Sequence, residues 1–169
     1  MALGGLLVTA ALTAQAATPF QVDVATAIDR GVEWLANSGA FTNTSSAGDA
    51  SGLAMLALLE KRASGNPVDP PQGYIGANAT DQGRLRSAAS YILDRANETS
   101  FYAYRDGAWM FALASYALSG GPDKSVLAPG NADYETIKEA MDRLVDRAVA
   151  NQAQPSNVGG ANPARWGYW

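Results

Sequence analysis

Residues 53–59 read Leu-Ala-Met-Leu-Ala-Leu-Leu, an uninterrupted apolar run. The run contains no β-branched residue, and Ala, Leu and Met are strong helix formers, so it predicts an α-helix rather than a strand. A second apolar run, Ala-Trp-Met-Phe-Ala-Leu-Ala, occupies residues 108–114. A helix that is apolar all round must be buried on every side. We therefore expect two fully buried helices, over about residues 49–62 and 106–119.

Three other segments carry an apolar stripe on one side only. They cover about residues 24–37, 80–97 and 134–152, where apolar residues recur at helical spacing. In the first segment, the residues expected to face the core are Val24, Ile28, Gly31, Val32 and Leu35. Those expected to face solvent are Asp23, Asp29, Arg30 and Glu33. In the last segment, Arg147 is expected to belong mostly to the solvent-facing row.

The two kinds of segment alternate, and the alternation is an internal repeat. Residues 31–37 align with residues 91–97, and Asp49 aligns with Asp106. Repeats of this size indicate an array of helical hairpins, each too small to bury its own apolar face. The predicted fold is all-α, with about five helices in an incomplete double ring, the apolar helices inside and the striped ones outside. The striped segment at 134–152 has no apolar partner after it, so we expect a C-terminally truncated domain over 18–169 whose partners include the remaining repeats of a parent polypeptide.

Four stretches carry a resemblance to a known superfamily. They are Arg-Gly-Val-Glu-Trp-Leu at 30–35, the stretches 49–59 and 106–113, and Arg-Trp-Gly-Tyr at 165–168. The pattern resembles the α/α-toroid repeats of the terpenoid cyclases and protein prenyltransferases, notably the squalene–hopene cyclase-like group. The resemblance implies a barrel of inner helices with a cavity among their ends and loops. The chemistry of that superfamily does not carry over, because the Asp-x-Asp-Asp cluster of the cyclases has no counterpart, and the Cys and His of the prenyltransferase zinc site are absent.

Composition excludes several classes of function. The chain has no Cys and no His, so it can form neither a Ser-His-Asp triad nor a thiol nucleophile, and a structural zinc site loses its usual ligands. Twelve basic residues against 16 acidic ones give a net charge of −4, which argues against a nucleic-acid partner. The sequence thus predicts no metal site, no cofactor and no nucleic-acid binding.

Residues 1–17 are predicted to be a signal peptide. The apolar stretch from Ala2 to Leu12 has the length of a signal core and is too short to span a bilayer, and Ala14-Gln15-Ala16 fits the small-x-small cleavage pattern. The alternative is a buried helix, because the segment lacks the usual basic residue at its start. We expect an exported protein, periplasmic or extracellular, with no stable membrane span after the leader is removed.

The candidate ligand-binding residues each have a structural alternative. They are Asp49, Asp106, Tyr104, Arg105, Trp109, Trp166 and Tyr168. The two aspartates are either paired carboxylates for acid–base work or N-caps of their helices. Tyr104, Arg105 and Trp109 either line a pocket for an apolar or glycan ligand or pack the core. The two C-terminal aromatic residues form either a binding rim or an interface left open by truncation.

A cluster of arginines offers one further candidate site. Arg84, Arg86 and Arg95 either attract an anion or form a solvated helix face. No residue is assigned a catalytic role. We expect a helical-repeat module of binding or scaffolding type; the alternative is a fragment of an enzyme, either terpene-cyclase-like or an α/α-toroid polysaccharide lyase.

Overall fold

The computed structural model describes residues 16–42, 50–128, 130 and 135–152. In this part of the chain six helices form and no β-strand does, which confirms the predicted all-α class. The helices are α1 (Pro19–Asn37), α2 (Ser51–Leu59), α3 (Ala79–Arg95), α4 (Ala103–Leu118), α5 (Lys124–Leu127) and α6 (Ile137–Asn151). The short α5 lies between the predicted helical segments 106–119 and 134–152, where no helix is predicted, and the predicted leader falls outside the described residues except for Ala16 and Ala17.

Local signals set the ends of the helices. Helix α1 begins five residues before its apolar stripe because Thr18 and Gln21 form a capping box and Pro19 occupies the first turn. Helix α1 ends just before Gly39 and α4 just before Gly120, whose φ angles are 76° and 87°. Glycine adopts this left-handed conformation without steric cost, so it ends a helix readily.

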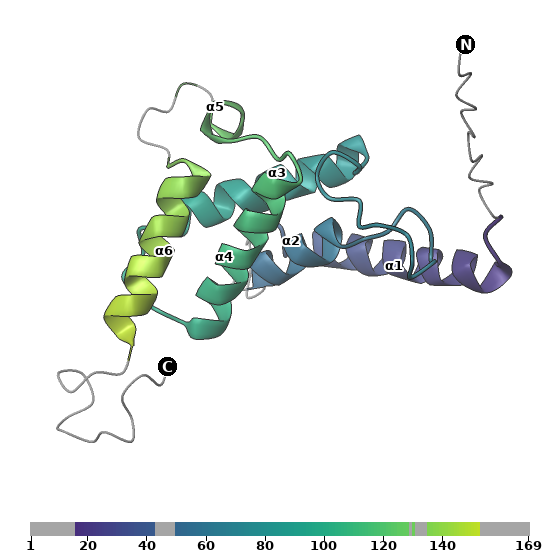
Figure 1. The fold of residues 1–169 in the computed structure, drawn as a ribbon, viewed down its shortest axis with the longest axis horizontal. Helices are drawn as coiled ribbons and strands as arrows, with labels where there is room; N and C mark the ends of the chain where they lie inside the picture. Colours follow the sequence, from purple (N-terminus) through teal and green to yellow (C-terminus); the bar gives the residue numbers. More distant parts are fainter. Residues whose placement is uncertain (1–15, 43–49, 129, 131–134, 153–169) are drawn as a thin grey trace, which may run out of the picture.

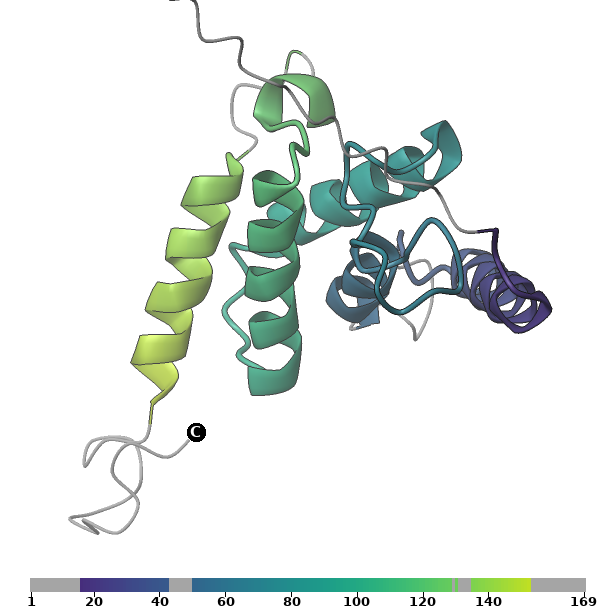
Figure 2. The same cartoon turned by 45° about the vertical axis from the view of Figure 1, so that its right-hand side comes forward.

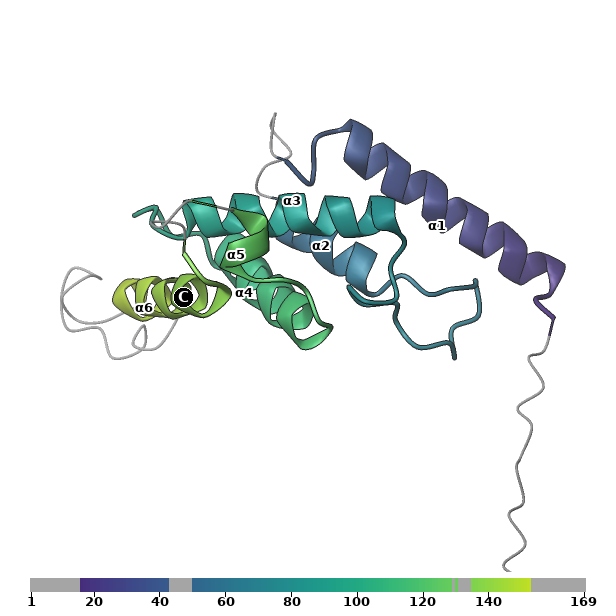
Figure 3. The ribbon, with the colours of Figure 1, turned by 90° about the horizontal axis from the view of Figure 1, so that it is seen from above.

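The two apolar helices lie next to each other at the centre of the molecule (Figures 1 and 3). Helix α3 packs against α2, and α6 lies alongside α4, running in the opposite direction (Figure 2). Helices α1 and α6 stand at opposite ends of the arrangement (Figure 1). None of the described helices combines the length and the apolar character needed to cross a bilayer.

A close contact between α2 and α4 depends on Gly52. A Cβ atom at this position would lie 2.8 Å from the carbonyl carbon of Ala108. Beside it, the indole N–H of Trp109 donates to Ser51 Oγ at 3.0 Å, and both side chains are fully buried. The missing Cβ therefore lets the two apolar helices approach until their polar groups can pair.

The core is built from α2, α3, α4 and α6. Its fully buried large aliphatic members are Met55, Leu58, Leu85, Ile92, Leu93, Leu113 and Leu144. Burying such side chains stabilises a fold by about 1.5–3 kcal/mol each, so this cluster is the main source of stability.

The expectation that α2 and α4 are buried on every side is wrong. Leu53 on α2 is 59% exposed, and Phe111 and Leu118 on α4 are 64% and 90% exposed. Each helix packs on one side and presents apolar side chains on the other. The cause is geometric: no helix in the described part of the chain lies over this side.

Candidate functional site

Four of the predicted site residues lie in the first two turns of α4, and they do not form one open pocket. Tyr104 is exposed, whereas Arg105, Asp106 and Trp109 are buried. Asp49, Trp166 and Tyr168 lie outside the described residues.

Asp106 is neither an N-cap nor an open acid–base group. The N-cap position of α4 is Tyr102, which makes no side-chain capping bond. Asp106 follows one turn later and is 0% exposed. One carboxylate oxygen accepts from Arg105 Nε at 2.8 Å, and the other accepts from Arg147 Nε at 2.9 Å. Both oxygens are therefore engaged in a buried ion-pair network.

Arg147 was expected to face solvent, and this expectation is wrong. It is buried on α6, and its guanidinium also donates to the backbone carbonyls of Ala96 and Glu98 beyond the end of α3. Arg105 donates to Glu98 and to the carbonyl of Ser100. The network thus joins the end of α3 to α4 and α6.

Trp109 packs in the core and does not line an open pocket. Its ring meets Tyr91 edge-on, with centroids 6.1 Å apart, and the guanidinium carbon of Arg105 lies 4.5 Å from its centroid. Arg105 also lies over the ring of Tyr102. The rings of Tyr102 and Trp109 therefore stabilise the guanidinium group of Arg105, whose role here is structural.

The three arginines proposed as an anion site do not converge. Arg84 pairs with Asp81 and Glu33, Arg86 donates to the hydroxyl of Tyr74, and Arg95 pairs with Glu98 and lies over Tyr91. The three arginines lie at different positions along and around α3, so each guanidinium group contacts different neighbouring residues.

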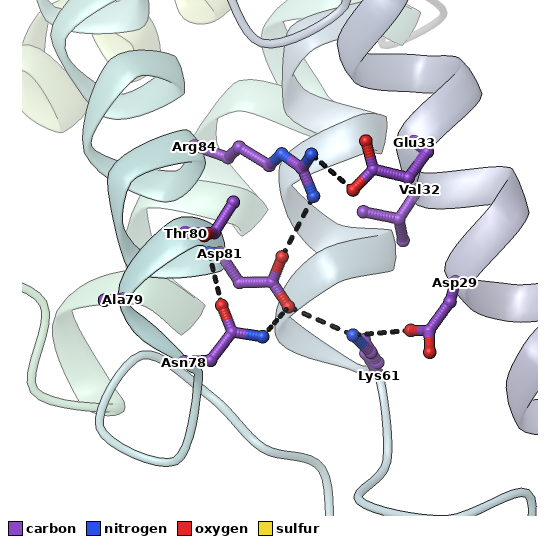
Figure 4. A pocket seen from close by; sticks show the side chains of 9 residues that line it. All are labelled: Asp29, Val32, Glu33, Lys61, Asn78, Ala79, Thr80, Asp81 and Arg84. Carbon is purple, nitrogen blue, oxygen red and sulfur yellow. Dashed lines mark hydrogen bonds and ion pairs between the residues drawn. The ribbon is translucent and has the colours of Figure 1, made fainter.

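A polar pocket of about 550 Å³ lies between α1 and the start of α3 (Figure 4). Asp81 stands at its centre and is almost fully buried. Its carboxylate accepts from Lys61 Nζ at 3.0 Å and from Arg84 at 3.1 Å. Lys61 also pairs with Asp29 at 2.8 Å, and Arg84 with Glu33 at 2.6 Å.

These contacts form an alternating chain of five charges, Glu33–Arg84–Asp81–Lys61–Asp29 (Figure 4). Partial burial by itself lowers the pKa of Lys61, but its hydrogen bonds to Asp29 and Asp81 outweigh that effect, so the pKa is raised. Lys61 therefore remains charged at neutral pH. Each of the two cations in the pocket already pairs with two carboxylates, so the geometry suits a clamp between α1 and α3 better than a ligand site.

The sequence offered one signal for this clamp. Asp29 and Glu33 are four residues apart on one side of α1, and we assigned that side to solvent because it is charged. In the structure it faces the cations of the neighbouring elements, which lie far away in the chain.

A groove of about 580 Å³ lies where α2 and α4 end. It is lined by Leu59, Glu60, Pro71, Gln72, Gly73, Ile75, Ser115, Ala117, Leu118, Ser119 and Gly120. Glu60 follows Leu53 and Ala57 along the exposed side of α2, and Leu118 follows Phe111 along the exposed side of α4. Since Glu60 and Leu118 line one groove, the two exposed sides adjoin. We call this surface, defined by Leu53, Ala57, Phe111 and Leu118, the α2–α4 face.

Within the described ranges, no three Asp or Glu side chains come together as a metal site would require. Comparison with known proteins adds no relative: no family model, no curated protein and no solved structure matches the chain.

Proposed function

We propose that this chain is an exported helical-repeat module that binds an apolar partner on the α2–α4 face. The observation that carries the proposal is the exposure of Leu53, Phe111 and Leu118 on two packed helices. Contiguous exposed apolar surface of this kind marks interaction sites in soluble proteins. The signal peptide inferred at residues 1–17 supports the exported location.

The proposal includes the α/α-toroid-like arrangement. The direct packing of α2 on α4 supports it, because these are the helices expected inside, and the striped α3 and α6 lie against them. In such an arrangement the α2–α4 face would look towards the interior of the ring. An apolar helix of a further repeat, or an apolar ligand, would then cover it.

Binding is favoured over catalysis by what the candidate residues do. Asp106 and Arg105 are engaged in buried ion pairs, and Trp109 packs in the core. The side chains at the α2–α4 face are apolar and suit contact rather than proton transfer.

Site-specific photocrosslinking would test the proposal. A benzophenone amino acid at Phe111 should capture a defined partner in the cells that produce the protein, whereas the same group at the exposed Asp94 on α3 should not. The purified partner should then bind the unmodified chain and bind Phe111→Ser at least tenfold more weakly, about 1.4 kcal/mol. Equal capture at both positions, or equal affinity for both chains, would contradict the proposal.

A further inference from the structure

Helix α1 is attached to the rest of the molecule through one side, which carries both charged and apolar residues. Asp29 and Glu33 pair with Lys61 and Arg84, and Val32 is the one residue of the helix that is buried. Figures 1 and 3 show that the N-terminal part of α1 projects beyond the other helices. The opposite side of α1 is therefore open to a partner.

That open side carries a regular apolar seam. Phe20, Ala27 and Trp34 recur every seven residues, and Phe20 and Trp34 are 74% and 67% exposed. Gly31 follows Ala27 by four residues, and a Cβ there would meet no atom within 4 Å. Val24 follows Phe20 by four residues at the edge of the seam, where it is half-buried against Gly65. Positions i, i+4, i+7, i+11 and i+14 lie in one row along a helix, and two helices pack against each other along such rows.

Two opposite charges flank the seam on one side. Asp23 and Arg30 are also seven residues apart, and both are exposed. Among the described residues neither of them forms an ion pair.

We propose that the seam of α1 binds the same seam of a second copy of this chain, with the two helices antiparallel and a twofold axis at Ala27. In this arrangement Phe20 lies opposite the second copy's Trp34, because each is seven residues from Ala27. Gly31, which has no side chain, lets the two helices come close beside this aromatic pair.

Charge complementarity selects this partner and this direction. Asp23 lies four residues before Ala27, and Arg30 lies three residues after it. Because the twofold axis reverses the direction of the second helix, Asp23 of each copy lies almost level with Arg30 of the other copy. The offset between them along the helix axis is about one residue, or about 1.5 Å. A twofold axis perpendicular to both helices keeps the two residues on the same side, so two ion pairs form. In a parallel pair the twofold axis would run along the helices and place the flanking charges of the two copies on opposite sides of the seam, so these ion pairs would not form. The dimer goes beyond the proposed function, since it uses a different helix from the α2–α4 face.

Charge reversal tests the dimer directly. Sedimentation velocity of the full chain should show a monomer–dimer equilibrium, and Asp23→Arg or Arg30→Asp alone should weaken it at least tenfold. A mixture of the two variants should form a heterodimer at least as stable as the wild-type dimer, because every charge then meets its opposite. Asp94→Arg, at an exposed position on α3, should leave the equilibrium unchanged.

A cysteine supplies a second readout, since the chain has none of its own. Ala27→Cys should form an intermolecular disulfide under mild oxidation, and Asp94→Cys should not. A chain that stays monomeric at about 100 μM, or a dimer that tolerates both single reversals, would overturn the proposal. Phe111→Ser should leave dimerisation intact while weakening partner binding, so the failure of one proposal can be distinguished from the failure of the other.

Discussion

Asp106 links α4 to α6 through a buried ion pair with Arg147. Its carboxylate is fully buried and accepts from Arg105 and Arg147, so its removal would take away the carboxylate that pairs with the buried Arg147 and leave Arg105 with Glu98. Removing one partner of a buried ion pair typically costs about 3–5 kcal/mol. We expect Asp106→Ala to lower the free energy of unfolding by that amount, as measured by urea denaturation.

The control at this scale is Asp94, an exposed aspartate on α3. Asp94→Ala should change the free energy of unfolding by no more than about 0.5 kcal/mol, as is usual for surface positions. A loss of less than about 1 kcal/mol for Asp106→Ala would show that the network contributes little. The sequence could place Asp106 near the start of a helix, but not beside Arg147, which is 41 residues away in the chain.

At the scale of the element, we expect the start of α6 to respond to pH. The backbone N–H of Thr136 donates to the Glu139 carboxylate at 2.8 Å, and the Thr136 hydroxyl donates to the same oxygen, so the pKa of Glu139 is lowered from its usual 4.5. A carboxyl group whose pKa is lower in the folded state stabilises it fully above the unfolded pKa and loses that contribution as the pH falls through the folded value. We expect the first turn of α6 to exchange its amide hydrogens faster as the pH falls below about 4.5, after correction for the intrinsic exchange rate.

The matched variant is Glu139→Gln, whose amide oxygen can still accept from Thr136 but does not titrate in this range. Its first turn should show no acid-dependent loosening beyond that of the remaining helix. An equal response in both chains would mean that Glu139 does not set the pH dependence. The capping box itself could be identified from Thr136 and Glu139 alone, because it is a local contact.

At the scale of the whole molecule, α1 lies at one end of the arrangement, and Val32 is its one buried residue. Its links to the rest of the molecule include two ion pairs, from Asp29 to Lys61 after α2 and from Glu33 to Arg84 on α3, and both acidic side chains are more than half exposed. Exposed ion pairs contribute about 0–1 kcal/mol each, so the attachment is weak. We expect Asp29→Asn combined with Glu33→Gln to speed amide exchange in α1 a few-fold and to leave α3 and α4 unchanged, by hydrogen–deuterium exchange mass spectrometry.

The comparison variant is Val32→Ala, which shortens the one buried side chain of α1 and should speed exchange further. Unchanged exchange in the Asp29→Asn, Glu33→Gln chain would show that the charges do not hold the helix. The same measurement on α2 should show little change, since its packing against α3 and α4 involves neither carboxylate.

The sequence by itself determined the all-α class and the approximate positions of five helices, because helical spacing, caps and glycine stops act within a few residues of each other. Only the tertiary structure decided which side of each helix is buried. Of the α1 residues assigned to the core, Val32 alone is buried, while Asp29 and Glu33 face the molecule because Lys61 and Arg84 meet them there. Likewise Phe111 stays exposed although α4 is apolar all round. Burial depends on which distant segments come together, and the periodicity of a single helix carries no information about its partners.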